Sequence, residues 1–111
     1  MIGLGPATRI LLAVEPVDGR LSFNGLLALV QNRLAADPLS GQVYVFTNRR
    51  RNRLKLLFWD GSGLFLCTKR LERARFGWPP NPGPGAPLRL EELLALIHGL
   101  ETRSRRGWYR V

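Results

Sequence analysis

The chain has 111 residues, of which 45% are hydrophobic, so its size and composition fit one globular domain and exclude two full domains or a largely disordered chain. Its 17 Lys and Arg residues against 8 Asp and Glu residues give a formal net charge of +9. Because basic side chains release condensed counterions when they neutralise phosphates, this surplus favours nucleic acid as a partner. The alternative is a basic protein in which arginine is simply frequent.

Cys67 is the single cysteine, which excludes an internal disulfide and a cysteine-based zinc site. We expect a buried, reduced thiol, as in a cytosolic protein. No segment approaches the ~18 consecutive apolar residues of a membrane span, and the N-terminus lacks the features of a secretory signal. The sequence therefore predicts a cytoplasmic protein without a membrane partner.

The N-terminal part predicts one strand and one helix. Residues 9–14 form a short apolar run rich in β-formers, which ends before Pro16. Ser22 is a favourable N-cap for a helix that we expect to reach about Ala36. The apolar stripe of this helix repeats at helical spacing and consists of Phe23, Leu26, Leu27, Val30 and Leu34.

The middle of the chain predicts three strands, at residues 42–48, 53–59 and 64–70, which are rich in β-branched, aromatic and other apolar residues. The connections at residues 49–52 (RRRN) and 60–63 (DGSG) are both short. Short connections between consecutive strands are typical of hairpins, so we expect a three-stranded antiparallel meander.

The two faces of this meander follow from symmetric closure of each hairpin about its loop. One face is then apolar and should pack on the first helix; it consists of Val43, Val45, Leu54, Leu56, Phe58, Phe65 and Cys67. The other face is mixed, apolar at one end and basic at the other, and consists of Tyr44, Phe46, Asn48, Arg53, Lys55, Leu57, Trp59, Leu64, Leu66, Thr68 and Arg70.

Beyond the meander the sequence predicts a loop, a second helix and a tail. Residues 79–87 hold five of the eight prolines, so we expect a loop or extended linker there. A second helix should run from Leu90 to about Gly99, with an apolar stripe of Leu90, Leu93, Leu94, Ile97 and Leu100. Residues 101–111 are basic and contain Trp108 and Tyr109, and we expect them to be flexible.

These elements predict an α+β fold. The N-terminal strand and helix pack on the three-stranded antiparallel meander, and the C-terminal helix follows the Pro-rich loop. Residues 1–100 are expected to form a single domain, with the 79–87 loop inside it and a tail at 101–111.

The basic residues are concentrated in the meander, where nine of the seventeen fall within about a quarter of the chain. We expect these nine to contact DNA phosphates: Arg49, Arg50, Arg51, Arg53, Lys55, Lys69, Arg70, Arg73 and Arg75. Trp59, Phe76 and Trp78 are interleaved with them and could stack on bases or line an interface. For the two Trp residues we favour packing in the core, because large aromatic side chains are usually buried.

A catalytic constellation is missing from the sequence. His98 is the only histidine, so there is no Ser-His or Cys-His arrangement to predict. A metal-dependent nuclease needs converging carboxylates, whereas the best candidates, Asp18, Asp60 and Glu72, are scattered. We therefore expect neither enzymatic activity nor a metal or cofactor.

Several motifs carry a family resemblance: Asn48-Arg49-Arg50, Lys55-Leu56-Leu57, Trp59-Asp60-Gly61, Lys69-Arg70-Leu71-Glu72 and Trp78-Pro79. In order and spacing the chain resembles the TnpB (Orf2-like) accessory proteins of the insertion-sequence family sixty-six transposons. The chain departs from that family at Gly19, Asn24 and Arg51-Asn52, and the last departure makes the loop more basic.

The resemblance implies a role in DNA transposition beside a separate transposase that carries the catalytic residues. We thus expect a non-catalytic accessory protein that binds DNA, at transposon ends, and/or the transposase of the same element through a basic hairpin face. The alternative is a protein-interaction subunit without direct DNA contact. Its docking surface would be the second helix and the apolar part of the mixed face (Tyr44, Leu57, Leu64 and Leu66), against the transposase or a second copy in a homo-oligomer.

Overall fold

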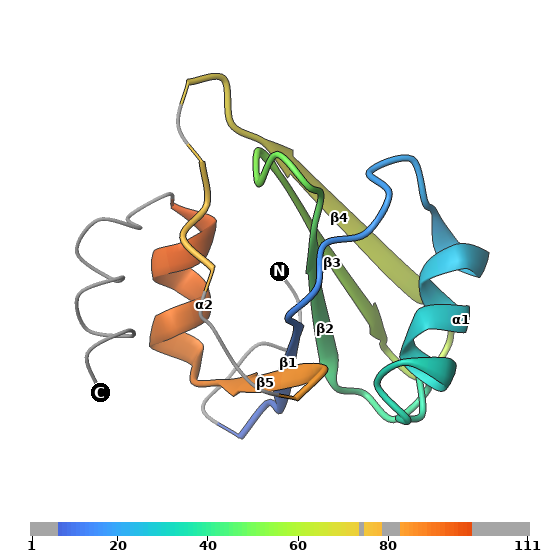
Figure 1. The fold of residues 1–111 in the computed structure, drawn as a ribbon. Helices are drawn as coiled ribbons and strands as arrows, with labels where there is room; N and C mark the ends of the chain where they lie inside the picture. Colours follow the sequence, from blue (N-terminus) through green and yellow to red (C-terminus); the bar gives the residue numbers. More distant parts are fainter. Residues whose placement is uncertain (1–6, 74, 79–82, 99–111) are drawn as a thin grey trace.

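The fold is known from a computed structural model that describes residues 7–73, 75–78 and 83–98. The elements in chain order are β1 (Ile10–Ala13), α1 (Phe23–Asn32), β2 (Val43–Thr47), β3 (Arg53–Trp59), β4 (Leu64–Arg70), β5 (Gly85–Leu88) and α2 (Leu90–Ile97). The strands form one sheet in the order β4-β3-β2-β1-β5. The two helices lie on opposite faces of this sheet, which gives three layers (Figure 1).

The predicted meander is confirmed. β2, β3 and β4 pair antiparallel in sequence order, with Val45 opposite Leu56 and Leu56 opposite Cys67. This register is that of two symmetrically closed hairpins, so the predicted division of the side chains between the two faces is also confirmed.

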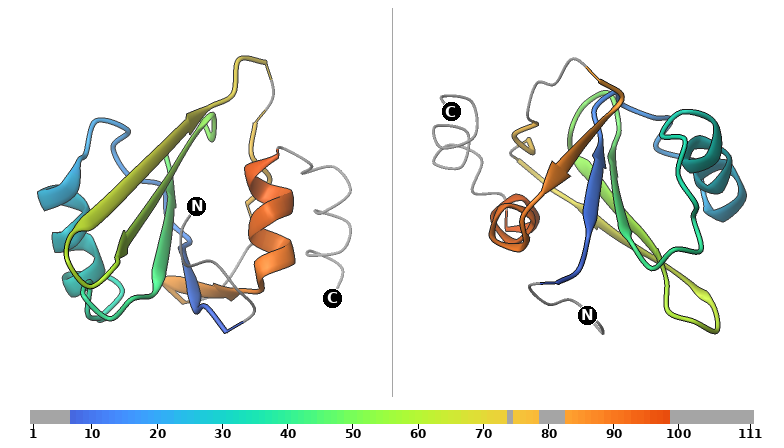
Figure 2. Two further views of the ribbon diagram at one scale, coloured as in Figure 1. Left: turned by 180° about the vertical axis from the view of Figure 1, so that it is seen from behind. Right: turned by 90° about the horizontal axis from the view of Figure 1, so that it is seen from below.

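The predicted covering of those faces is wrong. Helix α1 packs on the mixed face, where Tyr44, Phe46 and Leu57 are fully buried with Leu26 and Val30 of the helix. The apolar face is instead covered by Leu93 and Leu96 of α2, together with Phe76 and Trp78. The ribbon views show α1 and α2 on opposite sides of the sheet (Figure 2). A mixed face can be covered because its polar tips find partners: the Tyr44 hydroxyl donates to the carbonyl of Asp37 at 2.8 Å.

The N-terminal strand joins the sheet rather than packing on the meander. β1 pairs parallel with β2, in the register Ile10 opposite Val43. A parallel neighbour requires a crossover connection, and α1 supplies it. The helix is shorter than predicted, because it ends at Asn32 and Ala35 adopts a positive φ of 50°.

The Pro-rich segment was predicted as a loop, and this is wrong for its last part. β5 pairs antiparallel with β1 at the edge of the sheet. Proline has no backbone N–H to donate. Pro87 is tolerated because, in an edge strand, alternate backbone nitrogens point to solvent and form no ladder hydrogen bond.

α2 begins at Leu90 as predicted, but Leu96 is buried and Leu94 is 42% exposed, so the apolar stripe of this helix is rotated from the predicted one. Leu100, Trp108, Tyr109 and the predicted tail lie outside the described residues.

Candidate nucleic-acid interface

The hairpin loop between β2 and β3 is shaped by the side chain of Asn48. Its Oδ1 accepts hydrogen bonds from the backbone N–H groups of Asn52 and Arg53, both at 3.1 Å, and its Nδ2 donates to Asn52 Oδ1 at 2.7 Å. The N–H of Arg51 donates to the carbonyl of Asn48 at 3.0 Å, and Arg51 has a positive φ of 59°. Arg49, Arg50 and Arg51 are therefore presented, exposed, on a closed turn.

The chain that leaves β4 runs beside this loop. The N–H of Leu71 donates to the carbonyl of Asn52 at 2.8 Å, and the N–H of Phe76 donates to the carbonyl of Arg51 at 2.7 Å. These bonds bring the exposed side chains of Arg70, Arg73 and Arg75 to the same end of the sheet. Within the ladder itself, Arg53 lies directly opposite Arg70.

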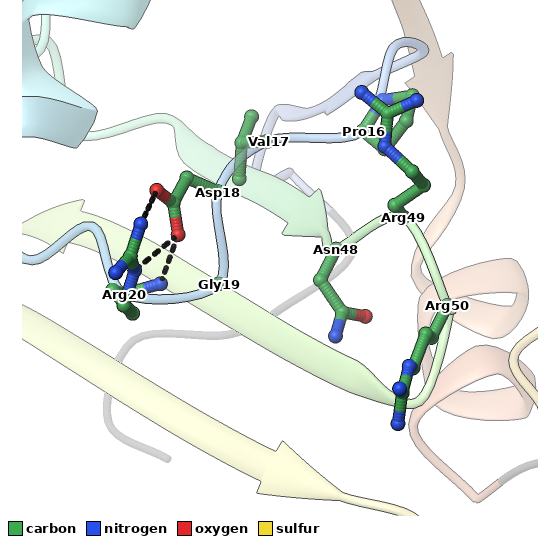
Figure 3. A pocket seen from close by; sticks show the side chains of 8 residues that line it. All are labelled: Pro16, Val17, Asp18, Gly19, Arg20, Asn48, Arg49 and Arg50. Atoms are coloured by element: carbon green, nitrogen blue, oxygen red, sulfur yellow. Dashed lines mark hydrogen bonds and ion pairs between the residues drawn. The ribbon is translucent and has the colours of Figure 1, made fainter.

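A third segment, the turn after β1, adds an arginine that is not among the nine residues predicted to contact DNA. The N–H of Val17 donates to the carbonyl of Thr47 at 2.8 Å, and Val17 forms an isolated parallel bridge with Asn48. Arg20 thereby borders a groove of about 440 Å³ whose other wall contains Arg49 and Arg50 (Figure 3). In the sequence, Arg20 belongs only to an Asp18-Gly19-Arg20 turn, and nothing in that turn indicates that it lies beside the β2–β3 loop.

Asp18 holds Arg20 in place within this groove. Arg20 donates from Nε and Nη2 to the two carboxylate oxygens of Asp18, and its backbone N–H donates to Oδ1 at 2.9 Å. The side-chain hydrogen bonds from Arg20 lower the pKa of Asp18 from its ordinary 3.8 to about 2, so the pair is ionised at neutral pH. Nη1 of Arg20 makes no bond to another described residue.

We refer to the assembled surface as the basic end of the sheet: Arg20, Arg49, Arg50, Arg51, Arg53, Arg70, Arg73 and Arg75. Its two carboxylates, Asp18 and Glu72, pair with Arg20 and Arg70. Eight arginines against two carboxylates leave a surplus of six positive charges at one end of a small domain. Like charges held this close repel each other, and a bound polyanion would relieve that repulsion.

Two of the nine predicted basic residues lie differently. Lys55 is 8% exposed on the face under α1, and its Nζ donates to the carbonyl of Leu21. Burial lowers the pKa of this amine. Lys69 projects from the opposite face, where its Nζ donates to the carbonyl of Ile97 at 2.7 Å. The structure therefore brings together the arginines and leaves the two lysines outside the group.

The aromatic residues do not form a stacking surface. Phe76 is 2% exposed and Trp78 is 3% exposed, so neither can stack on bases; the suggestion of stacking is wrong, and the core packing favoured for Trp78 is confirmed. Trp78 also satisfies its indole N–H, which donates to the carbonyl of Ala13 at 2.9 Å. Trp59 is half-buried opposite Leu64, at the end of β3 away from the basic end.

The surface suggested for a protein partner is also wrong in part, since Tyr44 and Leu57 are fully buried under α1, and Leu64 and Leu66 pack beside them.

Across the described part of the chain, no three His, Cys, Asp or Glu side chains gather as a metal site would require. Asp60 instead closes the β3–β4 turn. None of the described helices is long and apolar enough to cross a membrane.

Comparison with known proteins identifies the family. Residues 8–107 match the family described as IS66 Orf2 like protein. A relative in Sinorhizobium fredii (strain NBRC 101917 / NGR234), "Uncharacterized protein y4jC", is 44% identical over 107 residues, which are 96% of this chain and 92% of the relative. "Uncharacterized protein y4hO" of the same strain is 34% identical over 110 residues, 99% of this chain and 96% of that protein. No solved structure matches the chain. The chain therefore belongs to the IS66 Orf2 like protein family, which implies an accessory role in transposition.

Proposed function

We propose that this protein is a non-catalytic accessory protein that binds DNA during transposition through the basic end of its sheet. The observation that carries the proposal is the convergence of three separate segments, which gather eight arginines around one hairpin tip. Arginine suits this role because its planar guanidinium donates two parallel hydrogen bonds to a phosphate.

The arrangement of the arginines argues against a purely structural role. Arg53 and Arg70 oppose each other in the ladder, and like charges in directly opposite positions destabilise a sheet. Arg51 occupies a left-handed conformation that costs a non-glycine residue free energy. Both costs lower stability without improving packing, and DNA phosphates would offset the electrostatic one.

The topology decides which part of the basic end can meet a duplex. β2 and β3 are inner strands of the sheet, so only the loop that joins them, and not the ribbon itself, is free to approach the DNA. Arg49 and Arg50 on this loop would contact phosphates, while Arg73 and Arg75, on the neighbouring segment, would reach the flanking backbone. Phosphate contacts of this kind fix orientation and affinity.

The test is a salt titration of binding to labelled transposon-end DNA and to scrambled duplex, followed by fluorescence anisotropy. The variant Arg49→Gln, Arg50→Gln, Arg51→Gln is compared with a charge-matched control, Arg9→Gln, Arg33→Gln, Arg89→Gln, whose three arginines are exposed outside the basic end. We expect steeply salt-dependent binding of the unmodified protein. The hairpin variant should lose at least about tenfold in affinity and up to about 2.7 from the salt slope, and the control much less.

Two outcomes would overturn the proposal. Equal losses in the two triple variants would mean that net charge alone, rather than the basic end, binds DNA. A salt slope below about one for the unmodified protein would exclude an interface with several phosphates. Preference for the end sequence over scrambled duplex would add specificity to the proposed role.

The transposase of the same element is the proposed protein partner, because the family works in transposition. Co-purification of tagged protein with that transposase tests this second contact separately from DNA binding. Nuclease treatment before the pull-down distinguishes a direct contact from one bridged by DNA.

A further inference from the structure

β4 is a seven-residue strand at one edge of the sheet, and its outer side has no neighbouring strand among the described residues. Its first five residues, Leu64 to Thr68, are uncharged, and Phe65 is 39% exposed while stacking on Phe58 at a ring-centroid distance of 5.0 Å. Long uncharged edges present unpaired backbone groups and readily pair with another strand. We propose that β4 pairs antiparallel with β4 of a second copy of this chain across a two-fold axis at Cys67.

The direction of the backbone groups along β4 sets which registers are allowed. At the two ends of the β3–β4 ladder, the N–H of Asp60 donates to the carbonyl of Gly63, and the N–H of Leu71 donates to the carbonyl of Asn52. Hydrogen-bonded positions alternate along an antiparallel ladder, so the odd-numbered residues of β4 direct their N–H and carbonyl groups toward β3. Leu64, Leu66, Thr68 and Arg70 therefore direct their N–H and carbonyl groups outward, to the free edge.

A two-fold axis at Cys67 uses all of these outward groups. Leu64 then pairs with Arg70 of the second copy, and Leu66 pairs with Thr68, so outward groups meet outward groups over the full strand. The Cys67 residues of the two copies become a non-hydrogen-bonded pair, with Cα atoms about 4.5 Å apart. That separation lies within the range that a disulfide spans.

The charges of the edge favour the same register. Parallel pairing in register would place Arg70 beside Arg70, and an antiparallel axis at Lys69 would oppose two lysines. With the axis at Cys67, each cation lies opposite an apolar residue, and Lys69 lies opposite the exposed ring of Phe65, where a cation–π contact is favourable. The two Arg70 Cα atoms would be about 20 Å apart along the strands, beyond the Debye length of about 8 Å at physiological salt.

Of each basic end, the pairing engages only the backbone of Arg70, and the other seven arginines remain free. Each basic end lies toward the Arg70 end of its own β4, so they point away from the axis in opposite directions. The dimer would have one continuous ten-stranded sheet with two DNA-binding ends, yet its formation does not depend on DNA binding.

Cysteine cross-linking tests the register directly, because Cys67 is the only thiol in the chain. Mild oxidation should convert the protein to a reducible dimer linked through Cys67. In a Cys67→Ser background, Phe65→Cys and Lys69→Cys should cross-link when the two variants are mixed. Phe65→Cys alone should not, because its thiols would be separated by four residues, about 13 Å.

The mass of the protein in solution, from light scattering during gel filtration, gives an independent result. We expect twice the monomer mass for the unmodified protein and for Thr68→Ala. Thr68→Pro should be monomeric, because it removes one outward N–H without removing a bond to β3. A monomeric unmodified protein would overturn the proposal. Failure of the mixed 65/69 pair to cross-link would do so too, whether or not the proline variant folds.

Discussion

The two hairpin loops of the meander use the same scaffold with different residues. Asn48 begins the first loop and Asp60 the second, and in each the side-chain Oδ1 accepts two backbone N–H groups, at 3.1 Å for Asn48 and 2.9 Å for Asp60. The hydrogen bonds from Ser62 and Gly63 hold the pKa of Asp60 below its ordinary value.

The difference lies in the residue that takes the positive φ. Gly61 has a φ of 101°, and nothing lies within 4 Å of the position of a Cβ there, so glycine is required by the backbone alone. In the first loop the corresponding role falls to Arg51, a residue that this conformation disfavours. The β3–β4 loop thus has the composition of a stable turn, whereas the β2–β3 loop contains three consecutive arginines and has a strained backbone at the third.

The largest effect is expected from removing the scaffold of the first loop. Asn48→Ala should lower the free energy of unfolding by about 2 kcal/mol, because it leaves the N–H groups of Asn52 and Arg53 without their acceptor. DNA affinity should fall as well, since the arginines lose their fixed positions. Urea denaturation measures the first effect. Asn48→Asp, which keeps the acceptor oxygen, is the control and should retain most of the stability; equal losses would contradict the assigned role.

A smaller loss is expected from imposing an arginine on the second loop. Gly61→Arg should lower the free energy of unfolding by about 1–2 kcal/mol, because a Cβ is strained at this φ. Gly63→Arg adds the same charge to the same loop without a positive φ, and should change stability by less than about 0.5 kcal/mol. Thermal or urea unfolding of both proteins checks this; an equal effect at the two positions would show that charge, not backbone strain, is responsible.

The reverse exchange should separate stability from function. Arg51→Gly is expected to raise the free energy of unfolding by about 0.5–1 kcal/mol and to lower the DNA-binding salt slope by about 0.9, the share of one phosphate. Arg50→Gly removes the same charge where φ is not positive, so it should weaken binding while lowering stability. If Arg51→Gly destabilises the protein, the strain argument fails.

The smallest effect concerns the acid stability of the turn beside the first loop. Because the pKa of Asp18 is lowered to about 2 in the folded protein, the pair with Arg20 contributes stability above pH 3.8 that is lost as the pH falls toward 2. Asp18→Asn should therefore have a flatter decline in urea midpoint over this range, and should match the unmodified protein near pH 2. An unchanged pH profile would contradict the assigned pair.

Local patterns predicted the meander well. The observed bounds of β3 and β4 are the predicted ones, and the faces follow from side-chain alternation and loop length. The pattern could not say which helix covers which face. The first helix was expected on the apolar face, and the basic residues of the mixed face gave no indication of a helix there, yet Lys55 reaches the carbonyl of Leu21 with its amine while its stem is buried.

The candidate interface was only partly accessible from the sequence. The run of arginines at residues 49–51 was visible as a cluster, whereas Arg20 joins it through a bridge between Val17 and Asn48, thirty-one positions apart. Core packing was the favoured prediction for Trp78 and is confirmed, whereas Phe76 looked suited to stacking because it follows basic residues. The hydrogen bond from the Phe76 N–H to the Arg51 carbonyl turns this segment back into the core.

The sequence by itself determined the net charge, the family, the strands of the meander and their two faces, because these depend on composition, motifs and a period of two residues. The tertiary structure alone decided that β1 and β5 extend the sheet, that α1 and α2 take opposite faces, and that three distant segments share one basic end. Those features depend on contacts between residues that are far apart in the chain. A local pattern of side chains does not indicate the free energies of such contacts.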